Sequence, residues 1–440
     1  MVNSATMKYL LLLAVLPLLA QTPKDPVWDA YQTWQTEHQN LDYKAQSQSL
    51  LEVSAKWVAQ WPGSQFAWEQ RREALVRTRS SDAELWKQVG ENIIRLYPPH
   101  AGAPMIAYDW VAAGVNVKDA EALLTAELAW QDSEAQLPEP AAPTLKDLLE
   151  AANRSARVFG PLCTLTSAQI QLQEYAAARS TIARVRQWLD TDFKRFYDPD
   201  PLSAFPDYQA KYWQLSGKLA EAEKRNADAL AYYHELIANP YYRREYGAGI
   251  LQHTRPLWDK MGGTDSGWAV FSAAPPLPPG VPSGNPGVPF LPWHALNYKL
   301  PPMDLPAFAL ARATNHSFEG KSTVVYLWAS WCGPCWSSLP AVQALYDQTK
   351  DRKDLQVITL SIDDDIEKLI AFMKEKKYTF PVAVGKAYVD SFLPQAAPGQ
   401  VWIVDRTGSV RLQRAENQFR GIEKAFTDEL LYKLNQVAAK

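Results

Sequence analysis

A proline-rich segment divides this 440-residue chain into two parts with different sequence patterns. The stretch from Ala273 to Pro306 carries eleven prolines. Because proline has no backbone N–H and a fixed φ, this density excludes an interior helix or a central strand. We therefore predict that residues 269–305 form an extended, semi-rigid linker between two folded regions. The alternative is a loop packed against one of the domains.

The part before this linker, residues 25–268, has the apolar spacing of successive helices and few strand-like stretches. The segments KWVAQWP and NIIRLYP each resemble a helix that an aromatic–proline step closes, at Pro62 and Pro98. We predict an all-α region in which helix pairs stack, because one pair cannot bury its own apolar face.

One helical segment, YWQLSGKLAEAEKRNADALAYYHELIANP, resembles a tetratricopeptide-type repeat. The residues at the positions of that repeat are Trp213, Gly217, Ala229 and Tyr233. Small residues let two helices approach closely, and large aromatic residues fill the space between pairs. We therefore assign the aromatic content to core packing. Such arrays often present a concave surface, so a protein partner on this region is a further expectation.

The composition is that of an ordinary globular protein, with 47% hydrophobic and 21% charged residues and a net charge of −3. The chain has no basic stripe, which argues against a nucleic-acid partner. Three cysteines are too few for a disulfide scaffold in a chain of this size.

The N-terminus has the pattern of an export signal. Lys8 precedes a run of twelve residues from Tyr9 to Ala20 that is apolar, after which the chain turns polar. This run is too short to cross a bilayer, which takes about 20 residues. We interpret residues 1–20 as a signal peptide, which predicts a periplasmic or otherwise extracytoplasmic protein. An uncleaved anchor is the alternative.

The part after the linker, residues 306–440, has an α/β pattern. A buried-strand run, STVVYLWAS, precedes a helix-like segment, CWSSLPAVQALYDQTK. A second strand and helix, LQVITLSID and DDIEKLIAFMKEKK, come next, followed by the hairpin GQVWIVDRTGSVRLQR and a closing helix. We predict a small mixed-sheet domain.

Two of the cysteines, Cys332 and Cys335, lie three positions apart between the first strand and its helix. A thiolate attacks disulfides, and a helix N-terminus stabilises the thiolate form. Cys332 therefore suits the nucleophile, and Cys335, nearly one turn later, can resolve a mixed disulfide. Gly333 and Pro334 suit a tight helix entry, since proline is tolerated in the first turn.

The segment WASWCGPC resembles the active-site signature of thioredoxin-fold proteins, and specifically of TlpA-type exported disulfide reductases. The segments LPAFAL, FEGKSTVV and VWIVDRTGSV and the residue Pro340 also resemble parts of that family. The resemblance implies a thioredoxin fold over residues 306–440 and a protein-disulfide reductase with no cofactor beyond its redox-active disulfide. It also implies that Trp331 flanks the exposed sulfur. Protein disulfides would be the substrates, and a membrane thiol–disulfide carrier would donate electrons.

Two positions depart from the pattern of that family. Thioredoxin has a buried aspartate six residues before its first active-site cysteine, where this chain has Tyr326. Glu367 or a water molecule are candidates for the acid–base role. Pro398 is the candidate for the family's cis-proline.

Three alternatives remain beside the redox enzyme, of which a peroxidase variant of the same fold is disfavoured because the CGPC pair sits where reductases have it. A structural zinc site would need four ligands, yet the chain has no second CxxC and its six histidines show no ligand spacing. The chain could instead be a helical-repeat scaffold with an auxiliary redox domain. Cys163, in the helical part, is interpreted as a small buried hydrophobe, with a third redox role as the less favoured interpretation.

Overall fold

The computed structural model describes residues 25–439, apart from residues 99, 135–139, 141–142, 198–206, 275–292, 394–395 and 416–422. The predicted signal peptide and residues 275–292 of the predicted linker lie outside the described residues. The chain forms two compact units, Met1–Leu124 and Thr125–Lys440. Each unit is described by itself, and helix α6 (Val117–Glu134) crosses the division between them.

The first unit consists of consecutive helices, and each of α2 to α4 packs against the next along the chain. Side chains of Asp42, Ser64 and Asp82 cap three of these helices by accepting a hydrogen bond from a backbone N–H of the first turn. The helices are α1 (Trp28–His38), α2 (Tyr43–Gln60), α3 (Gln65–Thr78), α4 (Ala83–Leu96) and α5 (Gly102–Ala113).

Tryptophans fill the core of this unit, as the sequence predicts. Trp34 and Trp57 are buried in one cluster, and Trp86 and Trp110 are buried between α4 and α5. Gly90 lets α4 approach α5 closely, because a Cβ atom at this position would lie 2.4 Å from the Trp110 ring.

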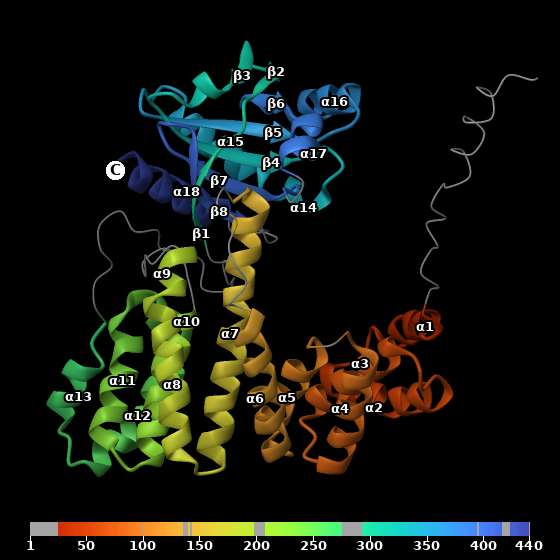
Figure 1. The fold of residues 1–440 in the computed structure, drawn as a ribbon, viewed down its shortest axis with the longest axis vertical. Helices are drawn as coiled ribbons and strands as arrows, with labels where there is room; N and C mark the ends of the chain where they lie inside the picture. Colours follow the sequence, from red (N-terminus) through yellow and green to blue (C-terminus); the bar gives the residue numbers. More distant parts are fainter. Residues whose placement is uncertain are drawn as a thin grey trace, which may run out of the picture. The chain divides into compact units, whose positions relative to one another are not determined.

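Most helices of the second unit also pack against a neighbour along the chain: α7 against α8, α10 against α11, and α11 against α12 (Figure 1). Gly217 in α10 lies directly against Tyr233 in α11, since an added Cβ would lie 2.5 Å from that ring. This contact matches the close approach that the repeat-like spacing predicts; membership of a repeat family stays a prediction. The helices are α7 (Leu145–Gln171), α8 (Tyr175–Asp190), α9 (Asp192–Phe196), α10 (Asp207–Ala222), α11 (Asn226–Ala238), α12 (Pro240–Lys260) and α13 (Asp265–Phe271).

The rest of the second unit contains an eight-stranded mixed sheet, in the order β1-β8-β7-β4-β5-β6-β2-β3, with helices between and after its strands (Figure 1). Strands β4, β5 and β6 are parallel. Strand β7 pairs antiparallel with β4 and forms the predicted hairpin with β8. The strands are β1 (His294–Lys299), β2 (Asp304–Phe308), β3 (Arg312–Thr314), β4 (Ser322–Trp328), β5 (Leu355–Ser361), β6 (Val382–Val384), β7 (Gln400–Val404) and β8 (Ser409–Ala415).

Helices α15 and α18 contact each other and both pack on the sheet, so they cover one of its faces. All seven residues of β4 are buried, as expected for a central strand between covered faces. The elements between and after the strands are η1 (Asn315–Phe318), α14 (Gly333–Trp336), α15 (Leu339–Thr349), α16 (Ile366–Lys376), α17 (Lys386–Phe392) and α18 (Glu423–Ala438).

The strand order β8-β7-β4-β5, with β4 and β5 parallel, is the core arrangement of the thioredoxin fold. The predicted fold class, an all-α part followed by an α/β thioredoxin fold, is therefore confirmed.

The predicted linker needs a correction at its C-terminal end. Strand β1 lies inside the range 269–305 and pairs with β8, so the sheet begins before the predicted boundary at residue 306. Residues 294–299 contain no proline, but proline-rich stretches lie on both sides of them. The sequence prediction therefore included this short strand in the linker. Strands β2, β3 and β6 and helix α17 were also absent from the prediction; each spans at most seven residues.

Candidate active site

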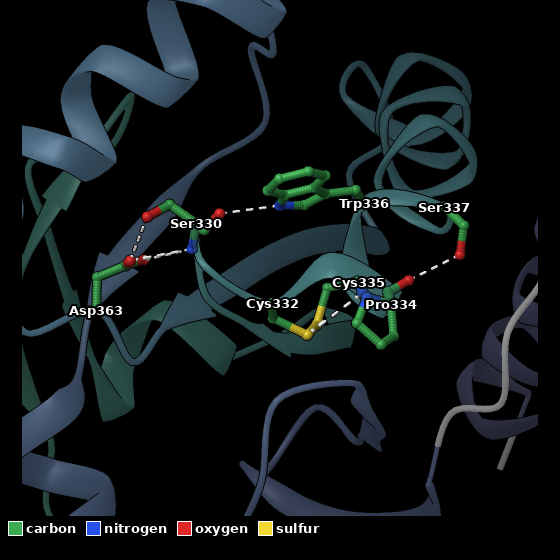
Figure 2. Close-up of a disulfide and its surroundings, with 7 residues drawn as sticks. All are labelled: Ser330, Cys332, Pro334, Cys335, Trp336, Ser337 and Asp363. Atoms are coloured by element: carbon green, nitrogen blue, oxygen red, sulfur yellow. Dashed lines mark hydrogen bonds between the residues drawn. A yellow bond between two sulfur atoms is a disulfide. The ribbon is translucent and has the colours of Figure 1, made fainter. Parts of the chain in front are cut away.

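The end of strand β4 delivers the two cysteines to a tight helix entry. The strand ends at Trp328, and Cys332 is the N-cap of the four-residue helix α14, with proline in its first turn. Cys332 and Cys335 are joined in a disulfide, with their Cα atoms 5.3 Å apart (Figure 2). The structure thus brings together Cys332, Gly333, Pro334 and Cys335, which the sequence assigned to one site.

The two cysteines differ in how far solvent reaches them. Cys332 is 7% exposed and Cys335 is fully buried. An approaching thiol or disulfide therefore reaches Cys332 first, which agrees with the predicted order of nucleophile and resolving cysteine. The backbone N–H of Cys335 donates a hydrogen bond to Sγ of Cys332 at 3.3 Å. In the reduced protein this donor would stabilise a thiolate at Cys332.

Two exposed tryptophans flank the disulfide. Trp331 is 60% exposed, as expected for a residue beside the reactive sulfur. Trp336 is 48% exposed, and its Nε1 donates a hydrogen bond to the backbone oxygen of Ser330 at 2.9 Å. Its ring also contacts Phe372 in α16, with ring centroids 6.0 Å apart. These rings give the surface around Cys332 an apolar face on which a polypeptide can pack.

A buried carboxylate, Asp363, holds the loop that leads to Cys332. Its two carboxylate oxygens accept hydrogen bonds from the backbone N–H of Ser330, each at 3.0 Å. One oxygen also accepts from Oγ of Ser330 at 2.5 Å (Figure 2). The other accepts from Oγ of Ser361 at 2.8 Å. Sequence reasoning missed this residue, although it ends the strand-like segment LQVITLSID. The carboxyl ends of neighbouring parallel strands meet at one sheet edge, and that rule could have placed Asp363 beside the cysteines.

Glu367, the candidate for the role of the aspartate that is absent at Tyr326, is exposed to solvent. Tyr326 is fully buried within β4, between Val401 of β7 and Thr359 of β5. Glu367 lies exposed in the first turn of α16, so it is not a buried acid. Asp363 is the buried acid next to the active-site loop.

Pro398 lies beside the end of β4. It occupies the second position of a turn in which the N–H of Gln400 donates to the oxygen of Ala397, with φ of 92° at Gly399. The N–H of Gly399 donates to the oxygen of Leu327 at 2.7 Å, which brings the turn against the strand that leads to Cys332. The cis geometry of Pro398 stays a prediction.

The third cysteine has a different environment. Cys163 is 4% exposed within α7, and burial raises the pKa of its thiol to about 12. It is therefore protonated and shielded near neutral pH, which argues against a third redox role.

Two kinds of feature are absent from the described part of the chain. No cluster of three or more His, Cys, Asp or Glu side chains there is arranged to hold a metal ion. None of its helices combines the length and the apolar character that spanning a membrane requires.

Comparisons with known proteins agree with this geometry. Residues 296–412 match the model of the AhpC/TSA family. Over 64 residues the chain is 36% identical to the thiol-disulfide oxidoreductase ResA of Oceanobacillus iheyensis, which is 14% of this chain and 33% of that protein. Over 68 residues it is 32% identical to the sporulation thiol-disulfide oxidoreductase A of Bacillus subtilis, which is 15% of this chain and 41% of that protein.

A solved structure, described as a putative thiol:disulfide interchange protein DsbE from Chlorobium tepidum, is 25% identical to this chain. The superposition covers 31% of this chain and 96% of the other, with a TM-score of 0.28. The chain spans only about a third of the length of ResA from O. iheyensis. Residues 296–412 are therefore similar to the AhpC/TSA family, and relatives that match part of the chain are named thiol-disulfide oxidoreductases.

Proposed function

We propose that this protein is a thiol–disulfide oxidoreductase that reduces disulfides in other proteins. The observation that carries the proposal is the Cys332–Cys335 disulfide after the end of β4, in which Cys332 is 7% exposed and Cys335 is fully buried. Relatives of the same domain named thiol-disulfide oxidoreductases support it.

The reaction runs through a mixed disulfide. In the reduced protein, the Cys332 thiolate attacks one sulfur of the substrate disulfide, and the other substrate sulfur leaves as a thiolate that takes up a proton. The Cys335 thiol loses its proton and attacks Cys332, which releases the second substrate thiol. Two electrons pass to the substrate, and the Cys332–Cys335 disulfide forms. An external dithiol donor must then return two electrons to the pair.

The direction toward reduction and the location of the reaction belong to the same proposal. The Gly-Pro pair between the cysteines is that of thioredoxin, at the reducing end of a range from about −270 to −120 mV. The pattern of residues 1–20 supports export, and a membrane thiol–disulfide carrier is the proposed donor. Recruitment of a protein partner by residues 25–268 stays a prediction, which a binding assay with those residues alone tests.

Insulin reduction tests the activity directly. The full chain should reduce insulin disulfides in the presence of dithiothreitol, and Cys332→Ser should lower the rate to the uncatalysed background. Cys163→Ser is the matched control, since it makes the same substitution at a buried thiol outside the site; it should keep the wild-type rate. A wild-type rate in Cys332→Ser would reject the proposal.

A further inference from the structure

Asp363 is a buried carboxylate whose hydrogen bonds all come from neutral donors. It is 3% exposed, and its partners are the N–H and Oγ of Ser330 and Oγ of Ser361. In the described part of the chain no lysine, arginine or histidine lies within ion-pair distance of it. Two other buried carboxylates differ, since Asp109 pairs with Arg72 and Glu429 pairs with Arg414.

The position of this charge relative to the cysteines is fixed by the loop. Ser330, which Asp363 holds by backbone and side chain, is two residues before Cys332. The oxygen of Ser330 accepts from Trp336, one residue after Cys335. One serine thus connects the carboxylate to both ends of the CGPC segment (Figure 2). Movement of the carboxylate would move the loop on both sides of the disulfide.

We propose that Asp363 is a positioning residue that also biases the cysteine pair toward acting as a reductant. This inference rests on the proposed thiol–disulfide exchange. When the disulfide takes up two electrons near neutral pH, one cysteine becomes a thiol and Cys332 becomes a thiolate. A nearby negative charge, poorly screened because it is buried, opposes that thiolate. The disulfide form carries no charge and is unaffected, so the reduced pair passes its electrons on more readily.

The other titratable side chains near Asp363 are those of Asp364 and Tyr326, and neither is a buried carboxylate. Asp364, the next residue, is exposed and lies 3.9 Å from Lys386 of α17, which also pairs with Asp390. Tyr326 is the buried phenol of the adjacent strand β4. Solvent and Lys386 screen the charge of Asp364. The exposed neighbour therefore provides a matched control for the buried one.

The test is the redox equilibrium of the full chain with glutathione, measured between pH 5 and pH 9 by trapping free thiols and by tryptophan fluorescence. Asp363→Asn keeps the shape of the side chain and removes its charge. At pH 8 we expect its equilibrium constant for oxidation by glutathione disulfide to fall about tenfold relative to wild type. By the two-electron relation, this is a rise of about 30 mV in reduction potential. At pH 5, where both thiols are protonated, the two proteins should converge.

Two further variants separate charge from geometry. Asp364→Asn should leave the equilibrium within about twofold of wild type, because that carboxylate is exposed. Ser330→Ala removes the hydrogen bond to Oγ but keeps the buried charge, so it should keep the pH dependence of wild type.

Three outcomes would overturn the inference. One is an unchanged equilibrium in Asp363→Asn, and another is a shift equal to that of Asp364→Asn. The third is a shift of equal size at pH 5 and pH 8, which would indicate altered loop geometry alone. The redox equilibrium with glutathione could behave as expected while the wild type fails to reduce insulin. That result would reject the proposed function but would still support the role of Asp363.

Discussion

At the scale of single residues, burial separates the three cysteines by chemistry. Cys332 reaches solvent at the edge of the disulfide, Cys335 is sealed behind it, and Cys163 is buried in α7. A buried thiol resists ionisation, because water no longer solvates its thiolate. The three cysteine sulfurs are therefore assigned three different roles: nucleophile, resolving group and part of the hydrophobic core.

The pH dependence of stability tests the environment of Cys163. Its pKa is raised to about 12 in the folded protein, whereas an unfolded cysteine ionises near pH 8.5. Between these values the folded state binds more protons, so stability is complete below about pH 8.5 and falls as the pH rises. We expect the unfolding free energy of wild type to fall more between pH 8 and pH 10 than that of Cys163→Ala, by about 2 kcal/mol. Urea unfolding at pH 8 and at pH 10 measures this difference. An equal loss of unfolding free energy in the two proteins would contradict the burial of Cys163.

The sequence predicts the cysteines, glycine and proline of the site because they are contiguous and their chemistry depends on that spacing. It does not identify Asp363, because its contacts with Ser330 depend on the parallel pairing of β4 and β5. Glu367 lies four residues after Asp363. The sequence alone does not show which of these two acids is buried, because that depends on where helix α16 begins, at Ile366.

At the scale of elements, strand β1 is attached to the domain by more than its pairing with β8. Trp293, just before the strand, is 2% exposed, and its Nε1 donates to Glu429 of α18 at 2.8 Å. Glu429 also accepts from Arg414 of β8 at 2.7 Å, and the Arg414 guanidinium lies 4.5 Å from the centre of the Trp293 ring. The tryptophan thus covers a buried ion pair that would otherwise face water.

Replacement of Trp293 tests this attachment. Trp293→Ala removes a buried ring and a hydrogen bond, and such changes cost about 3–5 kcal/mol. Amide hydrogen exchange in the full chain should show β8 opening more easily by about this amount. Trp293→Phe keeps the ring and loses the donor, so it should cost only about 1–3 kcal/mol. Wild-type protection of β8 in the alanine variant would mean that β1 contributes nothing to the fold of the domain.

At the scale of the whole molecule, the redox site is confined to one domain. The strands and loops that carry it lie between Ser322 and Val404, and the residues that match the AhpC/TSA family are 296–412. The sequence predicts the change from helical to α/β structure well, because helical and strand periodicities differ over long segments. It places the boundary too late, because a six-residue edge strand has little pattern of its own.

The most direct test of the central claim is to trap the mixed disulfide. Cys335→Ser should accumulate the full chain joined to an oxidised protein substrate, since the resolving thiol is gone. Mass spectrometry of the linked peptides should place the bond at Cys332, and Cys332→Ser should give no adduct. A bond at Cys163, or no adduct in Cys335→Ser, would contradict the assignment of Cys332 as the attacking thiol.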